Sequence, residues 1–251
     1  MSKTLVQEQF GKTAASYLTS KPHALGKSLE RMVALTAPQS DWRMLDIATG
    51  GGHVAYAFAP HVARAWASDI TQEMLDMVKA EAGKRGLVNL RTTYAKAEAL
   101  PFEDESFDLV TCRIAPHHFD SIPAFLGEVH RVLKTGGLLA LVDNVVPAGS
   151  TGDYVNAFER FRDPSHLRAW TLEEWRDALK AAGLAVTHEE RIYKTMEFNA
   201  WAARHDATMK ALLRSMLTQV TPAVNAVLEP KSVGDDMTFR LCEGLFIAKR
   251  A

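Results

Sequence analysis

Residues 45–52 (LDIATGGG) constrain the fold more than any other segment of the chain. An apolar run that carries one carboxylate, Asp46, is followed by a glycine-rich turn and then by an apolar pattern with helical spacing over 53–58. A second carboxylate, Asp69, ends the next apolar segment, 17 residues after Gly52. This order predicts a strand, a tight turn, a helix and a second strand, with one acid at the end of each strand.

The spacing of these residues suits a ligand that contains a nucleoside. Glycine adopts the backbone angles of a tight turn without a clash at Cβ, and it lets a ligand pass close to the main chain. Asp69 can accept hydrogen bonds from two neighbouring ribose hydroxyls. Asp46, four residues before Gly50, can face an ammonium group of the ligand, directly or through water. Nicotinamide-binding sites usually have an apolar residue there because phosphate lies nearby, so the two acids together predict a different nucleoside site.

Apolar periodicity along the chain alternates between strands and helices. The sequence predicts strands over 43–48, 64–69, 90–95, 107–113 and 138–146, and helices over 52–60, 72–85 and 122–133. Such alternation indicates an α/β fold, in which a mainly parallel sheet carries helices on both faces. With 251 residues, the chain is long enough for one such domain with insertions, and we predict a single domain over 1–251.

The segments around this core are predicted to be mostly helical. Helical spacing over 5–18 and 24–36 predicts N-terminal helices within 1–40, ahead of a cofactor-binding core over 41–146. The second half predicts a helix over 153–168, a capping box at 171–174 that opens a helix ending at 182, a strand over 184–198 and helices over 199–229. We therefore expect 147–236 to cover the substrate and 237–251 to hold the last strand.

Three further stretches, together with 46–52, resemble one family. Residues 95–108 (AKAEALPFEDESFD) resemble the "AE-x-LPF…D-x-SFD" segment of small-molecule methyltransferases. Residues 111–119 (TCRIAPHHF) are similar to the end of their fourth strand, and residues 132–138 (VLKTGGL) to the turn before their fifth. Over 43–146 the chain thus resembles the class I S-adenosylmethionine (SAM)-dependent methyltransferases, in the small-molecule branch that includes the ubiquinone/menaquinone-biosynthesis methyltransferases.

The resemblance implies a Rossmann-like seven-stranded sheet with an antiparallel last strand, and SAM as the cofactor. Carried over by position, the cofactor-binding residues are Asp46, Ala48, Gly50, Gly51, Gly52, Asp69, Ile70, Ala97 and Glu98. Lys96 departs from the pattern, because many relatives have an Asp or Asn there that accepts a hydrogen bond from the adenine amino group. Lysine cannot accept one, so adenine recognition is expected to rely on main-chain groups.

Other side chains are candidates with two interpretations each. Tyr17 and Phe10 share one stripe of a predicted helix. The stripe either packs the first helix against the protein or closes over the cofactor as a lid, with the Tyr17 hydroxyl at the carboxylate of the cofactor. Arg113 either lines the active site, as a cofactor contact, or pairs with a surface acid. Four residues at helical spacing either roof an apolar substrate or belong to the core, namely Trp201, Met209, Leu213 and Met216.

The expected reaction demands little acid–base chemistry. The methyl group of SAM is already activated, so catalysis mainly requires an acceptor held in line with the S–CH₃ bond. A base is needed only for an acceptor that arrives protonated. His117 and His118 are the best candidates, because they follow the fourth strand at the edge where open α/β sheets bind ligands, although either can instead bond the helix start at Ser121 or pack structurally. His23 and His166 are weaker candidates, and the nine histidines show no metal-ligand spacing.

Composition limits the classes of binding partner and the compartment that we expect for this chain. A net charge of −1 shows no global basic surface for nucleic acid, and two cysteines make neither a disulfide framework nor a zinc cluster. No segment approaches the length of a membrane span and the first residues lack a signal-peptide pattern, so we expect a cytoplasmic protein without membrane insertion. The expected substrate is a small, partly apolar or aromatic molecule methylated on O, N or C. The sequence does not predict an oligomeric state.

Three alternatives stay open at this point. An RNA or protein methyltransferase would want a basic surface, and the Asn/Asp-Pro-Pro-Tyr type of amino-methylating motif is absent after the fourth strand. A non-catalytic SAM-binding or partner-binding protein would have the same sequence pattern. A nicotinamide-dependent oxidoreductase fits the glycines at 50 and 52, but Asp46, the Leu-Pro-Phe segment and the Gly136–Gly137 turn argue against it.

Overall fold

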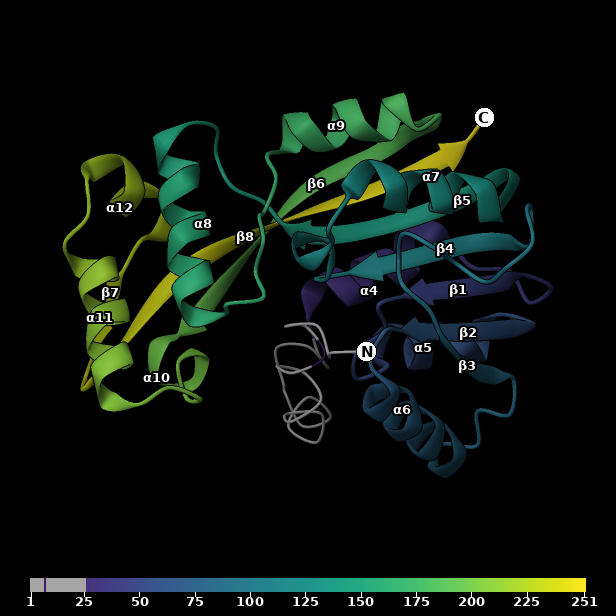
Figure 1. The fold of residues 1–251 in the computed structure, drawn as a ribbon, viewed down its shortest axis with the longest axis horizontal. Helices are drawn as coiled ribbons and strands as arrows, with labels where there is room; N and C mark the ends of the chain where they lie inside the picture. Colours follow the sequence, from purple (N-terminus) through teal and green to yellow (C-terminus); the bar gives the residue numbers. More distant parts are fainter. Residues whose placement is uncertain (1–6, 8–25) are drawn as a thin grey trace.

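The computed structural model describes Gln7 and residues 26–251, and its centre is one mixed β-sheet (Figure 1). The strand order is β3-β2-β1-β4-β5-β8-β6, with a short β7 paired to β8. The first five strands run parallel, whereas β8 is antiparallel to both β5 and β6. The bounds are β1 Arg43–Ile47, β2 Arg64–Asp69, β3 Leu90–Tyr94, β4 Phe107–Arg113, β5 Leu133–Asn144, β6 Leu184–Glu197, β7 Lys231–Val233 and β8 Asp236–Arg250. The predicted α/β fold with an antiparallel last strand is confirmed.

Strand β7 is an eighth strand that the sequence did not predict. Its three residues are exposed and pair with the start of β8 across a turn at Gly234, whose φ is 58°. A strand with no buried face has no alternation of apolar and polar residues, so periodicity cannot detect it.

Helices cover both faces of the sheet, as predicted. On one face, α7 (Ile122–Val132) and α9 (Leu172–Ala181) share a buried cluster with β4, β5 and β8. On the other face, α4 (Lys27–Thr36) and α5 (His53–Phe58) pack on β1, β4 and β5, and α6 (Gln72–Lys84) packs beside α5 and β2. Two short 3₁₀ turns, η1 (Ala59–His61) and η2 (Pro116–His118), follow α5 and β4. No helix in the described part of the chain is long and apolar enough to span a membrane.

The two largest errors in the predicted boundaries each have a local reason. Helix α8 (Ser150–Arg162) ends six residues before the predicted 168, because Pro164 disfavours the helical conformation at Asp163. Strand β5 begins five residues before the predicted 138, because Leu133 already pairs with Phe107 across an irregularity in the ladder. The predicted helix over 5–18 lies outside the described residues, apart from Gln7.

The second half builds a separate lobe at one end of the two longest strands (Figure 1). Helices α8, α10 (Phe198–Trp201), α11 (Ala207–Thr218) and α12 (Pro222–Leu228) gather there around the ends of β6 and β8. Their apolar side chains form a buried cluster distinct from those of the main sheet. Leu213 is fully buried in this cluster, Trp201 is largely buried, and Met209 and Met216 pack against it. All four thus contribute to a core, and Trp201 also lines the cavity described below.

Replacing Thr171 with alanine should lower the free energy of unfolding by about 1 kcal/mol, with the loss of one N-cap. The predicted capping box is present: the Thr171 hydroxyl accepts from the Glu174 amide at 3.1 Å, and the Glu174 carboxylate accepts from the Thr171 amide at 2.9 Å. Urea unfolding of the variant measures the loss. Thr171→Ser keeps the hydroxyl and should retain most of the stability, whereas equal losses in both variants would contradict a capping role.

Candidate active site

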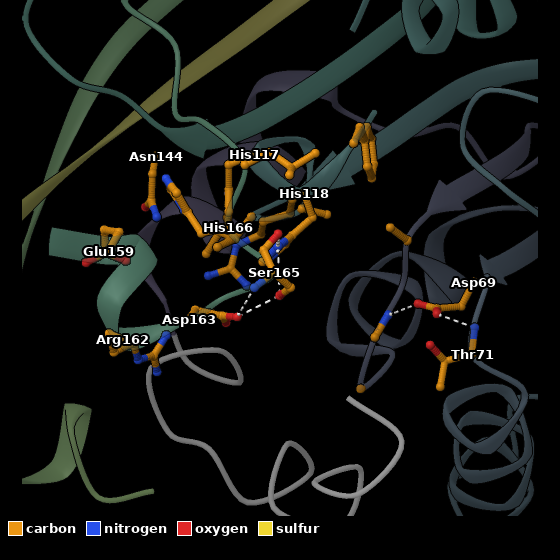
Figure 2. Close-up of a pocket in the computed structure, with 18 of the residues that line it drawn as sticks. Asp69, Thr71, His117, His118, Asn144, Glu159, Arg162, Asp163, Ser165 and His166 are labelled. Atoms are coloured by element: carbon orange, nitrogen blue, oxygen red, sulfur yellow. Dashed lines mark hydrogen bonds between the residues drawn. The ribbon is translucent and has the colours of Figure 1, made fainter. Parts of the chain in front are cut away.

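A cavity of about 1110 Å³ lies at the carboxyl ends of the parallel strands. Its walls come from the turn after β1, the ends of β2 and β4, the segment between α8 and α9, and residues 194–197 of β6. Figure 2 shows Asp69 and Thr71 at one end and the labelled histidines with Glu159 toward the other. Ligand pockets usually enclose about 300–1000 Å³, so this one has room for a nucleoside cofactor and a second small molecule.

The glycine turn after β1 shapes one end of the cavity. Gly50 and Gly52 have φ angles of 51° and 82°, in the left-handed region that glycine enters without strain, and Ala48 has φ 52°. A Cβ at position 52 would lie 2.6 Å from the Tyr56 ring, so only glycine fits there. Ala48, Gly50 and Gly51 line the cavity, whereas Gly52 does not; it lets the turn pack on α5.

Asp69 joins this turn to the end of β2. Its carboxylate accepts hydrogen bonds from the Gly50 and Thr71 amides, each at 2.9 Å (Figure 2). Burial raises the pKa of Asp69, although these backbone hydrogen bonds oppose the shift. Each carboxylate oxygen can accept a second hydrogen bond, so Asp69 can also accept from a ligand in the cavity, where Ile70 lies beside it.

Asp46 lies behind the turn and is not among the residues that line the cavity. Only 1% of it is exposed, and its two carboxylate oxygens accept from the hydroxyls of Thr49 at 2.6 Å and Thr111 at 2.8 Å. The structure thus gives Asp46 two partners within the protein. Its contact with the ammonium group of a ligand stays a prediction.

Replacing Asp46 with asparagine should stabilise the ligand-free protein above neutral pH. Burial raises the pKa of Asp46 from 3.8 to about 7, despite the hydrogen bonds from Thr49 and Thr111. Because the folded-state pKa exceeds the unfolded one, the stability that Asp46 contributes is complete below about pH 4 and is lost as the pH rises through about 7. Asparagine carries no such ionisation. At roughly 1.4 kcal/mol per pKa unit, the advantage of the variant should grow from near zero at about pH 4 to roughly 4 kcal/mol at about pH 8.

Urea unfolding at several pH values measures this difference. Asp76→Asn, at an exposed position on α6, is the matched control and should show a small, nearly pH-independent effect. An advantage of Asp46→Asn that does not change with pH would contradict a buried titrating carboxyl at this position.

The segment after β3 forms the edge of the same half of the cavity. Ala97 and Glu98 line it, as does Lys96. The Glu98 carboxylate accepts from the Asp120 amide at 2.9 Å, and the Lys96 ammonium pairs with the Asp120 carboxylate at 2.7 Å. Both charged side chains are therefore engaged with the loop after β4, which leaves backbone groups to meet a base.

Arg113 lies at the end of β4 and lines the cavity. Its Nε donates to the Ser28 hydroxyl of α4 at 3.1 Å. Burial lowers the pKa of Arg113, although the charges of Glu243 and Asp46 oppose that shift. Arg113 thus lies at the site, and its contact with the cofactor stays a prediction. Tyr17 and His23, the N-terminal candidates, lie outside the described residues.

The two histidines after β4 lie in η2, and they have different environments. His117 is 7% exposed, and its Nδ1 lies 2.6 Å from a carboxylate oxygen of Asp143, at the end of β5. Burial lowers the pKa of His117, but the charge and hydrogen bond of Asp143 outweigh it, so the pKa is raised above its ordinary value. A buried histidine oriented by a carboxylate is a common arrangement for a general base.

His118 points toward the segment between α8 and α9. Its Nδ1 lies 2.8 Å from the Ser165 carbonyl oxygen, which makes that nitrogen the donor. Burial and the neighbouring charge of His117 lower the pKa of His118 to about 3. The third histidine of the cluster is His166, whose Nε2 lies 2.9 Å from Asn156 Oδ1. Burial lowers the pKa of His166 to about 3 as well. The Ser121 hydroxyl, the predicted alternative partner of His117 or His118, accepts from the Ala124 amide and caps α7.

Several cavity residues were not predicted as site residues. They are polar groups that line the cavity or support its histidines: Asp143, Asn144, Glu159, Arg162, Asp163 and Ser165. One signal was available, since Asp143 and Asn144 lie near the end of the strand predicted over 138–146, at the same edge as Asp46 and Asp69. In the described part of the chain, no cluster of three or more His, Cys, Asp or Glu side chains could hold a metal ion.

Comparisons with known proteins agree with this geometry. A family model described as a methyltransferase domain matches residues 45–141. The uncharacterized methyltransferase YcgJ of Bacillus subtilis is 38% identical over 196 residues, 78% of each chain. The ubiquinone/menaquinone biosynthesis C-methyltransferase of Brucella abortus is 36% identical over 145 residues, 53% of each chain.

Among solved structures, a putative methyltransferase from Bacillus halodurans C-125 superposes with a TM-score of 0.85 at 34% identity. The match covers 90% of this chain and 99% of that one. The chain belongs to the class I SAM-dependent methyltransferases, with SAM as the cofactor.

Proposed function

We propose that this protein transfers the methyl group of SAM to a small, partly apolar or aromatic acceptor. One observation carries the proposal: the same cavity is lined by the glycine turn and by the apolar side chains of Met196, Trp201 and Leu241. The cavity thus joins a cofactor half to a second half with apolar walls. An acceptor with apolar or aromatic surface would gain from burial against these walls.

The residues of the cofactor half fit SAM. Gly50 and Gly51 let a ligand approach the main chain, and a Cβ at Gly50 would meet nothing within 4 Å, so the space above it is open. Asp69 would accept from the ribose hydroxyls, and Ile70 with Ala97 would flank the base. When bound there, SAM supplies a methyl group already activated by its sulfonium.

The acceptor half supplies orientation and a base. Asp143 fixes the His117 ring by its Nδ1 hydrogen bond, so the opposite ring nitrogen can take a proton from an acceptor hydroxyl or amine. His117 suits this role better than His118, because Asp143 raises the pKa of His117 while burial holds that of His118 near about 3.

The strongest rival is a protein of the same fold that binds SAM without methyl transfer. A fold does not fix one activity, since the [4+2]-cyclase SpnF superposes on the chain with a TM-score of 0.70 at 18% identity, a likeness of fold alone. The His117–Asp143 pair inside the cavity favours catalysis, because a protein that only binds SAM has no need of an oriented base.

Calorimetric titration followed by an acceptor screen tests the proposal. We expect the purified protein to bind SAM at micromolar concentrations and not to bind NADH. With bound SAM, a panel of phenols, amines and activated carbon acids should yield S-adenosylhomocysteine in proportion to methylated product. Binding of SAM without product from any acceptor class would favour the non-catalytic protein, and absence of SAM binding would overturn the proposal.

A further inference from the structure

Four carboxylates are buried around the acceptor half of the cavity, and one of them differs from the rest. Asp143, Glu159, Asp163 and Glu243 are each at most 7% exposed. Three have a basic side chain within salt-bridge distance: Asp143 has His117 at 2.6 Å, Asp163 has Arg204 at 3.0 Å and Glu243 has Lys194 at 2.7 Å. In the described part of the chain, Glu159 has no such partner within 4 Å. Its Oε1 is buried without a hydrogen bond, as are Asp143 Oδ2 and Glu243 Oε2, so the missing basic side chain is what distinguishes Glu159.

Glu159 lies on α8 at the wall of the cavity. A second cavity of about 490 Å³ adjoins the first, and Glu159, Asn144 and Leu241 line both of them. Figure 2 shows Glu159 and Asn144 together at the end of the site away from Asp69. Glu159 therefore forms part of the wall of both cavities.

The nearest cation on the same helix is turned elsewhere. Arg162, one turn after Glu159, has its guanidinium 5.3 Å from the centre of the Trp201 ring and donates to the Trp201 carbonyl. Burial raises the pKa of Glu159, while the charges of Arg162, His117 and Lys194 oppose the shift from a distance. A buried carboxylate without a partner costs several kcal/mol, and a cationic ligand would offset that cost.

We propose that Glu159 binds a protonated amine of the acceptor molecule, a step that rests on the proposed methyltransferase function. The ammonium would complete the fourth acid–base pair of the acceptor half, beside the apolar surface of Trp201 and Leu241. A protonated nitrogen has no lone pair, so this amine is a recognition group and the methyl goes to another atom. The acceptor class is thus an amine that carries a separate nucleophile, such as a phenol, within reach of His117.

Tyramine and its neutral isostere tyrosol are the probes, because they differ only in an amine in place of a hydroxyl. Calorimetry on the protein loaded with S-adenosylhomocysteine should give tyramine an affinity at least about tenfold higher, as charge-assisted hydrogen bonds are worth about 1.5–3 kcal/mol. In Glu159→Gln the two affinities should differ by less than about twofold. Glu197→Gln removes an exposed carboxylate from the same cavity and should keep the preference.

The Glu159→Gln variant should fold, because glutamine has the same shape as glutamate and removes a buried charge. Its melting temperature should equal or exceed that of the wild type. Equal binding of the two probes to the wild type, absence of tyramine binding, or an unchanged preference in Glu159→Gln would overturn the inference. Binding of S-adenosylhomocysteine in the same titrations separates the two proposals. If S-adenosylhomocysteine binds but tyramine and tyrosol bind equally, only the proposed amine site is refuted. If S-adenosylhomocysteine does not bind, the proposed function is refuted.

Discussion

Replacing Asp69 with alanine should weaken SAM binding by at least about 100-fold, since two hydrogen bonds to a charged group are worth about 1.5–3 kcal/mol each. The carboxylate lies at the end of β2 on the cavity wall and still has an acceptor site on each oxygen. It also holds the Gly50 amide at 2.9 Å, so its loss would loosen the turn that the cofactor approaches. Calorimetric titration with SAM measures the change in affinity.

Two further variants separate ribose binding from a general effect of charge. Asp69→Asn keeps one acceptor oxygen and should fall between the wild type and the alanine variant. Asp76→Ala removes an exposed carboxylate on α6 and should leave the affinity unchanged. Circular dichroism confirms folding, and an unchanged SAM affinity in folded Asp69→Ala would refute our placement of the ribose.

Replacing His117 with glutamine should lower kcat by about 10²- to 10⁴-fold for a hydroxyl or amine acceptor, the usual contribution of a general base. SAM affinity should change little, because His117 lies toward the acceptor half of the cavity (Figure 2). Asp143→Asn should lower kcat as well, since it removes the carboxylate that orients the ring at 2.6 Å. If the two act as one unit, the double variant should be no slower than the slower single variant.

The pH profile of kcat distinguishes a base from a structural histidine. Turnover requires neutral His117, so it should fall as the pH drops through the pKa of His117, which Asp143 raises above its ordinary value despite burial. Removal of the Asp143 charge should move this limb to lower pH. His118→Gln is the matched comparison and should retain most of the activity, because the pKa of His118 is already near 3. A larger loss in His118→Gln than in His117→Gln would exchange their roles.

The sequence was most informative where neighbouring residues alone determine the structure. Strands β2 and β4 match their predicted bounds, because each is a short apolar run closed by a turn. The glycine turn and Asp69 lie together because the strand ends meet at one edge of a parallel sheet. The capping box at Thr171 is equally local, and its two hydrogen bonds are present.

The sequence was least informative where function depends on distant parts of the chain. Asp143 meets His117 only because β4 and β5 are neighbours in the sheet, and Glu159 reaches the cavity only because α8 folds back over the strand ends. A buried, unpaired glutamate in the polar pattern 153–168 looks like any solvated residue of an amphipathic helix. The predicted lid function of the N-terminal helices and Tyr17 stays a prediction.

The long ladder between β6 and β8 links the two halves of the molecule while leaving their interiors separate. The ladder runs from the pair Leu184–Arg250, in the main sheet, through one irregularity between Val186 and His188, to the pair Glu197–Thr238 at the helical lobe. The lobe has its own apolar interior, which shares no buried side chain with those of the main sheet. Residues 198–233 can thus diversify during evolution, or be exchanged in an engineered chimera. The ladder would keep the exchanged segment in position relative to the cofactor-binding strands, which stay unchanged.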